Sequence, residues 1–109
     1  MIHVQVTQSG YLEPRSVVER ILVQGHAGSG EYGHDLVCAA VSALMINFIN
    51  SVETLCHIDL APIVRSGFID VRVSDDANIQ LLARSLLVGL TGISTEHAEW
   101  IQVQIDTCK

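Results

Sequence analysis

Residues 25–42 read GHAGSGEYGHDLVCAAVS, and both the fold and the chemistry of this chain are best approached from them. A glycine-rich loop headed by His26 leads directly into an apolar segment that carries Cys38. Glycine adopts backbone conformations that other residues avoid, so such a loop can fold back toward the helix that follows it. The pattern predicts an imidazole beside a thiol near the start of a helix.

Asp35 is predicted to be the N-cap of this helix, because its carboxylate can accept a hydrogen bond from the backbone N–H of Val37 or Cys38. From Leu36 to about Ile49 the segment is apolar almost all round, which indicates a buried helix. With Asp35 as the cap, Cys38 takes the third helical position. There the helix dipole favours a thiolate, whereas apolar neighbours oppose it.

The segments before the loop favour two strands. Apolar and polar residues alternate over 2–7, which is typical of a half-buried strand. Ser9-Gly10 then turns the chain, and residues 17–23 form the second predicted strand.

Two further strands are predicted after the helix. Residues 51–56 are expected to leave the helix, and residues 55–60 alternate again as a third strand. Pro62 and Ser66-Gly67 bracket a connection to a fourth strand at 68–73.

A second helix is predicted after residues 74–76, which supply a cap and negative charge for its first turn. Gly89 and Gly92 weaken this helix in isolation, so packing must hold it. Residues 100–105 alternate as a closing strand. The apolar stripe of the helix recurs at spacings of three and four, at Ile79, Leu82, Leu86 and Leu90.

The predicted fold is α+β: a two-layer domain with a roughly five-stranded, mostly antiparallel sheet and two helices packed on one face. A chain of 109 residues, 49% of them hydrophobic, is expected to form a single domain, 1–109, with a core that needs no disulfides. The sequence contains no stretch of about 18 consecutive apolar residues, so no membrane-spanning helix is expected.

The formal charge of −6 argues against direct nucleic-acid binding, which needs clustered lysine and arginine. A basic protein or peptide suits this charge better as a partner.

The three cysteines indicate free thiols. Cys38, Cys56 and Cys108 cannot all pair within one chain, and no Cys-x-x-Cys motif or signal peptide occurs, so a reducing cytoplasm is expected. Cys56-His57 resembles a second dyad, but adjacent residues of a strand point to opposite faces. Cys108 is interpreted as incidental.

The thiol of Cys38 and the imidazole of His26 also have simpler interpretations. A cysteine early in an apolar helix is more often an unreactive core residue, and a lone loop histidine rarely has a catalytic role. An imidazolium beside Cys38 would favour a reactive thiol over an unreactive core residue, because it stabilises the thiolate directly. His26, His34 and Cys38 could bind a metal, but their spacing fits no zinc pattern, so neither metal nor cofactor is expected.

Four residues near the pair are candidates for orienting the imidazole or contacting a substrate. Asp35 could orient an imidazole in addition to capping the helix. Ser42 lies one turn after Cys38, where it borders a pocket or bonds back to the carbonyl of Cys38. Gly25 and Gly33 permit unusual dihedral angles and close backbone approach.

Residues 25–42 resemble the signature of the Prp family of bacterial ribosomal-processing cysteine proteases. The matching elements are Gly-His-Ala at 25–27, Gly33, Asp35 and Cys-Ala-Ala-Val-Ser at 38–42, and chain length and element order fit as well. No comparable signature occurs over 50–67.

The resemblance implies a cytoplasmic thiol protease in ribosome biogenesis, with Cys38 as nucleophile and His26 as general base and acid. It implies cleavage of a short N-terminal extension from the precursor of large-subunit ribosomal protein twenty-seven. It further implies a homodimer with a flexible loop, here residues 28–33, over the active site. Two alternatives remain at this stage: a non-catalytic ribosome-associated peptide-binding module, and a structural or redox role for a free thiol.

Overall fold

The structure is a computed structural model that describes residues 1–10, 16–25 and 32–108. Its elements follow the order β1 (Ile2–Ser9), β2 (Val17–Gln24), α1 (Tyr32–Cys56), β3 (Ile63–Arg65), β4 (Phe68–Arg72), α2 (Ala77–Glu96) and β5 (Ile101–Cys108). This order of strands and helices was predicted from the sequence.

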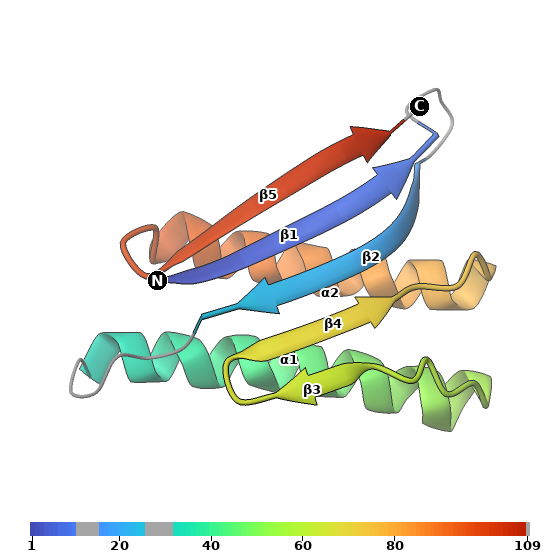
Figure 1. The fold of residues 1–109 in the computed structure, drawn as a ribbon, viewed down its shortest axis with the longest axis horizontal. Helices are drawn as coiled ribbons and strands as arrows, with labels where there is room; N and C mark the ends of the chain where they lie inside the picture. Colours follow the sequence, from blue (N-terminus) through green and yellow to red (C-terminus); the bar gives the residue numbers. More distant parts are fainter. Residues whose placement is uncertain (11–15, 26–31, 109) are drawn as a thin grey trace.

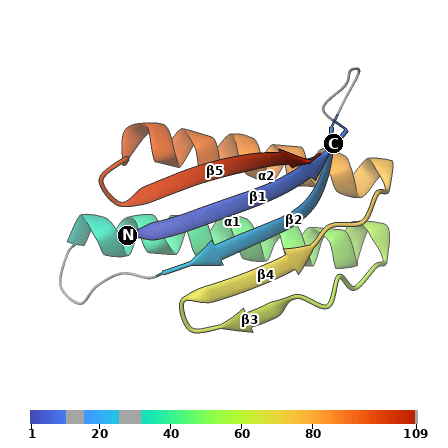
Figure 2. The same ribbon diagram turned by 45° about the horizontal axis from the view of Figure 1, so that its top comes forward.

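The strands form one five-stranded sheet in the order β3-β4-β2-β1-β5 (Figure 1). Neighbouring strands are antiparallel except β1 and β5, which run parallel in register from Ile2 opposite Ile101 to Ser9 opposite Cys108. Figure 2 shows β1 lying between β2 and β5. The predicted mostly antiparallel sheet is confirmed.

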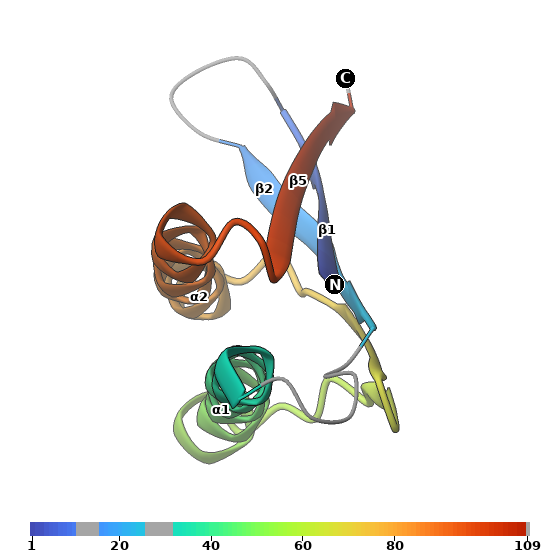
Figure 3. The same ribbon diagram turned by 90° about the vertical axis from the view of Figure 1, so that its left-hand side faces the viewer.

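Both helices cover the same face of the sheet, and the other face is open (Figure 3). The alternation predicted in β1 is observed, since its first, third and fifth residues are buried against the helices. The core is filled from α1 by a stripe that repeats every three or four residues: Val37, Val41, Met45, Phe48 and Val52. The predicted two-layer α+β architecture is therefore confirmed.

α1 differs from the prediction at both ends. It begins at Tyr32, so Asp35 is its fourth residue and cannot be its N-cap. Once a helix is nucleated, each further residue adds a backbone hydrogen bond, so an earlier start outweighs a capping side chain. The helix also continues beyond Ile49 to Cys56 because its buried stripe extends to Val52, which is fully buried.

The strand predicted at 55–60 does not form. His57 adopts a left-handed conformation with φ 58°, and Ile58 N–H bonds to the carbonyl of Val52 at 3.5 Å, which closes the helix. Glycine or asparagine usually takes this position, so the histidine concealed the helix end. The third strand instead follows Pro62, as β3, and pairs with β4 through the two-residue turn Ser66-Gly67.

α1 is also less buried than predicted, because only one of its stripes faces the core. Leu36 and Ile46 are 54% and 50% exposed. By length and composition alone, Leu36–Cys56 is apolar enough to cross a membrane, with a mean hydropathy of 1.6. Core helices of globular proteins pass the same test, and the stripe of this helix packs against the sheet.

α2 is fixed at its start by side-chain hydrogen bonds. Asp76 is the N-cap, as predicted for 74–76, and its carboxylate accepts from the N–H groups of Asn78 and Ile79 at 2.9 and 3.1 Å. The buried Gln80 amide donates to the carbonyls of Val18 and Ser74 and accepts from Val18 N–H, at 2.8–2.9 Å. These bonds tie the helix start to β2.

Gly89 allows close packing of the two helices. A Cβ atom at this position would lie 2.9 Å from a methyl carbon of Leu44 on α1, closer than ordinary contact. The prediction that packing must hold this glycine-containing helix agrees with that contact, whereas Gly92 has open space around it.

Candidate active site

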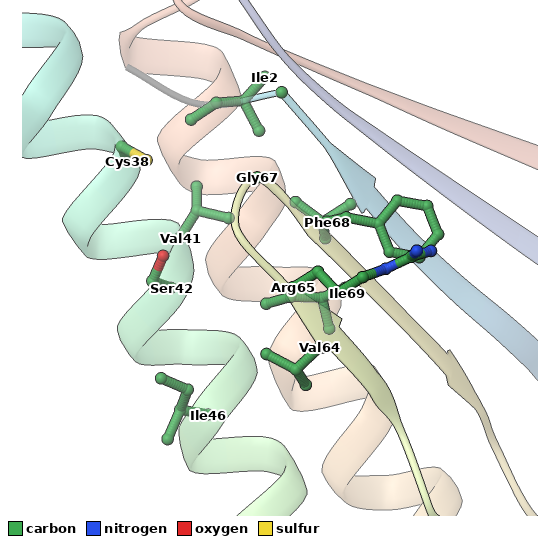
Figure 4. A pocket seen from close by; sticks show the side chains of 12 residues that line it. Ile2, Cys38, Val41, Ser42, Ile46, Val64, Arg65, Gly67, Phe68 and Ile69 are labelled. Atoms are coloured by element: carbon green, nitrogen blue, oxygen red, sulfur yellow. The ribbon is translucent and has the colours of Figure 1, made fainter. Parts of the chain in front are cut away.

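Cys38 faces a cavity between α1 and the β3–β4 hairpin (Figure 4). The cavity has a volume of about 170 Å³, similar to the roughly 150 Å³ apolar cavities that hold benzene. Its walls are mainly aliphatic side chains from α1, β3 and β4: Val41, Ile46, Val64 and Ile69. The space therefore suits one apolar side chain of a ligand beside a thiol.

The thiol of Cys38 is half-buried and free, and it lies on the α1 face that turns toward the hairpin. Cys38 is the seventh residue of the helix rather than the third. The dipole effect is largely confined to the first turn of a helix, so the predicted stabilisation of a thiolate by the helix start does not apply. Any activation must come from a neighbouring group.

Ser42 lies one turn after Cys38 and lines the same cavity. Among the polar side chains of the described residues, its hydroxyl is the one beside the thiol in a mainly aliphatic wall. Of the two placements considered for Ser42, this contact agrees with the one at the border of a pocket.

Gly25 brings the end of β2 to the mouth of this cavity. Its N–H donates to the carbonyl of Gly67 in the hairpin turn at 3.0 Å. Its φ of +96° is left-handed, and a Cβ atom here would lie 2.4 Å from the carbonyl oxygen of Met1. Glycine is therefore required at the residue that precedes the predicted catalytic histidine.

His26 lies outside the described residues, as does most of the predicted loop at 28–33; its last two residues, Tyr32 and Gly33, instead begin α1. Gly33 and Asp35 belong to the first turn of α1, where the structure describes the backbone only. Within the described part of the chain, no group of three His, Cys, Asp or Glu side chains could hold a metal ion.

The charged groups nearest the hairpin lie on the open side of the sheet. Arg20 and Asp70 form an ion pair of 2.8 Å, and the hydrogen bond from the guanidinium lowers the pKa of Asp70 below its ordinary value. Arg65 stacks on the ring of Phe68, 4.7 Å from its centroid. Arg65 and Phe68 are also among the residues that line the cavity.

Comparison with known proteins now identifies the family. The family described as cysteine protease Prp matches residues 1–102. Curated ribosomal processing cysteine proteases Prp from Staphylococcus aureus strains Mu50 and NCTC 8325 are each 33% identical over 107 residues, covering 94% of this chain and 97% of the relative. The chain belongs to the Prp family of cysteine proteases.

Solved structures agree with this assignment to the Prp family. SMU.848 from Streptococcus mutans superimposes with a TM-score of 0.86 at 31% identity, covering 99% of this chain and 96% of the other. S. aureus Prp in complex with a substrate peptide gives a TM-score of 0.76 at 28% identity, covering 97% and 100%. The same protease with a covalently linked product peptide gives 0.75 at 29% identity, with the same coverage.

Sequence reasoning missed the hairpin wall of this Prp site. β3 was predicted too early in the chain, so Val64, Gly67 and Ile69 were not recognised as neighbours of Cys38. A Ser-Gly pair between apolar residues is a hairpin signal and could have located this wall. Cys56 and Cys108, by contrast, are the last residues of α1 and β5, and Cys56 does not line the cavity.

Proposed function

We propose that this Prp-family protease removes the N-terminal extension of large-subunit ribosomal protein twenty-seven through a Cys38–His26 dyad. The observation that carries the proposal is the free Cys38 thiol facing an apolar cavity, at whose mouth the residue before His26 is anchored. The relatives' name, ribosomal processing cysteine protease, supports the substrate.

The proposed reaction proceeds through an acyl-enzyme. His26 takes the thiol proton, and the Cys38 sulfur attacks the scissile carbonyl to form a tetrahedral oxyanion. Collapse breaks the C–N bond, and the imidazolium of His26 gives its proton to the leaving amine. Water deprotonated by His26 then attacks the thioester, releasing the carboxylate product and the thiol.

The cavity supplies recognition in this scheme. An apolar side chain of the substrate fills the space between Val41, Ile46 and Val64, which removes apolar surface from water. The Ser42 hydroxyl donates a hydrogen bond to a carbonyl of the bound peptide. The covalently linked product peptide on S. aureus Prp is consistent with an acyl-enzyme here.

We also infer the setting of the reaction. The net charge of −6 complements a basic ribosomal protein precursor. The family resemblance further favours a cytoplasmic homodimer that acts without cofactor, nucleic acid or membrane.

Mass spectrometry of a peptide spanning the extension of the host's own ribosomal protein tests this proposal. Wild type and Cys56→Ala, which keeps Cys38, should each produce one cut, and Cys38→Ala should lose cleavage by about four to six orders of magnitude. Cleavage by Cys38→Ala would overturn the proposal. Peptide that binds to wild type without being cut would instead indicate a binding module.

A further inference from the structure

We propose that two copies of this chain pair through the outer edge of β5, antiparallel and with Ile105 facing its own copy. This edge lies at the opposite end of the sheet from the β3–β4 hairpin that lines the Cys38 cavity. The inference names the surface of the homodimer and rests on that part of the proposed function. It is independent of which peptide the protease cleaves.

The backbone of β5 turns every second residue away from β1. Ile2 N–H donates to the carbonyl of Trp100 at 2.8 Å, and Ile2 is in register with Ile101. In a parallel pair, one residue bonds to the residues on both sides of its partner, so the even-numbered residues of β5 turn their N–H and C=O groups toward β1. The odd-numbered residues turn theirs to the outer edge, where β5 ends the sheet (Figure 1).

The outward groups of Ile101 are already bonded within the chain. Its N–H donates to the carbonyl of His97 at 3.2 Å, and its carbonyl accepts from the hydroxyl of Ser94 at 3.5 Å. The next outward-facing residues are Val103, Ile105 and Thr107. In the described part of the chain no strand pairs with their outward groups, so they form an open hydrogen-bonding edge.

A second copy of the same strand fits this edge best in one register. With Ile105 opposite its own copy, Val103 lies opposite Thr107, and the outward groups of all three residues gain partners. Gln104 then lies opposite Asp106, so an amide meets a carboxylate and the two carboxylates do not face each other. Shifting the centre toward the start of the strand would use backbone groups that are already bonded.

β5 lacks the features that usually protect an exposed edge from pairing, which are lysine or proline residues, short length or a bulge. It has eight residues, none of them lysine, arginine or proline, and its ladder with β1 continues from Ile2 to Ser9 without a shift. The other edge strand of the described sheet, β3, has three residues and ends with Arg65. Of these two edges, β5 is the one that can pair along its length.

Apolar surface follows the β5 edge. Ile105 is 47% exposed, although it shares a face of the strand with the buried Ile101. On α2, Gly89 packs toward α1, so the residues two positions before and after it, Leu87 and Thr91, lie on the opposite flank, toward β5. Leu87 is only partly buried. Antiparallel pairing of β5 brings this flank beside its own copy, which adds to the surface that a stable dimer needs.

Sedimentation equilibrium of single substitutions tests the surface. Wild type should be a dimer, and Ile105→Lys should raise the dimer dissociation constant by on the order of 100-fold, because apolar contact is lost and two like charges meet. Ile63→Lys is the matched control. Ile63 is 51% exposed on the other edge strand, and this variant should keep the wild-type dissociation constant.

Cysteine cross-linking tests the register without adding a charge. In a Cys56→Ala, Cys108→Ala background, Ile105→Cys should form a disulfide-linked dimer in air, since directly opposite residues have Cα atoms about 5.5 Å apart, within disulfide range. Thr107→Cys is the control, because its own copy lies four residues further along the partner strand, roughly 13 Å away and beyond disulfide range. Non-reducing electrophoresis measures both variants.

Three results would each overturn the inference: a monomeric wild type, a dimer that Ile105→Lys leaves intact, or equal cross-linking of Ile105→Cys and Thr107→Cys. Peptide cleavage separates these results from a failure of the proposed function. A wild type that dimerises through β5 but leaves the peptide uncut would contradict the protease and keep the interface. A wild type that cuts the peptide as a monomer would contradict the interface alone.

Discussion

The starts of α1 and α2 both follow a strand of the same sheet, but the structure secures them in different ways. At α2, the side chains of Asp76 and Gln80 make the hydrogen bonds that fix the turn. Ahead of α1, the described contacts are made by the backbone of Gly25, and the side chains of Cys38 and Ser42 face a cavity. Anchoring by backbone leaves the side chains near the thiol available for substrate.

Substitution of Gln80 should destabilise the start of α2 without affecting catalysis. Gln80→Ala leaves buried N–H and carbonyl groups of Val18 without partners, so the free energy of unfolding should fall by about 2–4 kcal/mol. Thermal unfolding would show Tm lowered by roughly 10–20 °C. Peptide cleavage below that temperature should keep the wild-type kcat, and a large loss of kcat would contradict the comparison.

Val64 and Ile63 can test whether the cavity beside α1 receives the substrate. They are adjacent in β3 and similarly exposed, at 57% and 51%. Val64 lines the cavity, whereas Ile63, opposite Asp70, points to the open face. Val64→Asp should lower kcat/KM by about 10–100-fold, since a charge there opposes entry of an apolar side chain.

Ile63→Asp is the control for that experiment and should stay within about twofold of wild-type kcat/KM, because its side chain lies outside the cavity. Steady-state cleavage of the same peptide measures both variants. Equal losses in the two variants would show that the cavity does not receive the substrate.

The N-cap of α2 should have a smaller effect. Asp76→Ala removes the acceptor for two N–H groups and should lower the free energy of unfolding by about 1 kcal/mol. Asp75→Ala removes an equal charge from the neighbouring residue, with an expected change within about 0.5 kcal/mol. Urea unfolding of both variants measures the difference, and equal effects would exclude a specific capping role.

The ion pair between Arg20 and Asp70 should stabilise the fold by an amount that depends on pH. The hydrogen bond from Arg20 lowers the pKa of Asp70 in the folded state below the ordinary 3.8. Its contribution is therefore present at neutral pH and is lost as the pH falls below about 4 through the folded-state pKa.

Asp70→Asn should accordingly be less stable than wild type at pH 7, and the two should converge in acid. Urea unfolding between about pH 2 and pH 7 measures this difference. A stability gap that does not narrow in acid would contradict the assignment.

The fold was predictable where the spacing of the apolar residues was unambiguous. Alternation in β1 and the stripe of α2 placed these elements nearly as observed, and Asp76 lay within the predicted cap. The end of α1 was not predictable, because His57 takes a left-handed conformation that usually marks glycine. The start of α1 at Tyr32 was not predicted, because Asp35 is a favourable N-cap residue and therefore indicated a start one turn later.

The sequence predicted the thiol of the candidate site but not the residues of the β3–β4 hairpin that line its cavity. The spacing of the motif identified Cys38, Ser42 and Gly25, which line one cavity. The hairpin wall depends on tertiary pairing of β3 with β4, which periodicity cannot show for a three-residue strand. His26 stays a prediction, because it lies outside the described residues.

The parallel pairing of β1 with β5 has a consequence for the timing of synthesis. Ile2 pairs with Ile101, so the first strand gains its second neighbour only after nearly the whole chain has left the ribosome. Pairings this distant in sequence close late and slow folding. The segment that encloses Gly25 is thus completed last, and a nascent chain of this protease should gain activity only when its final strand has emerged.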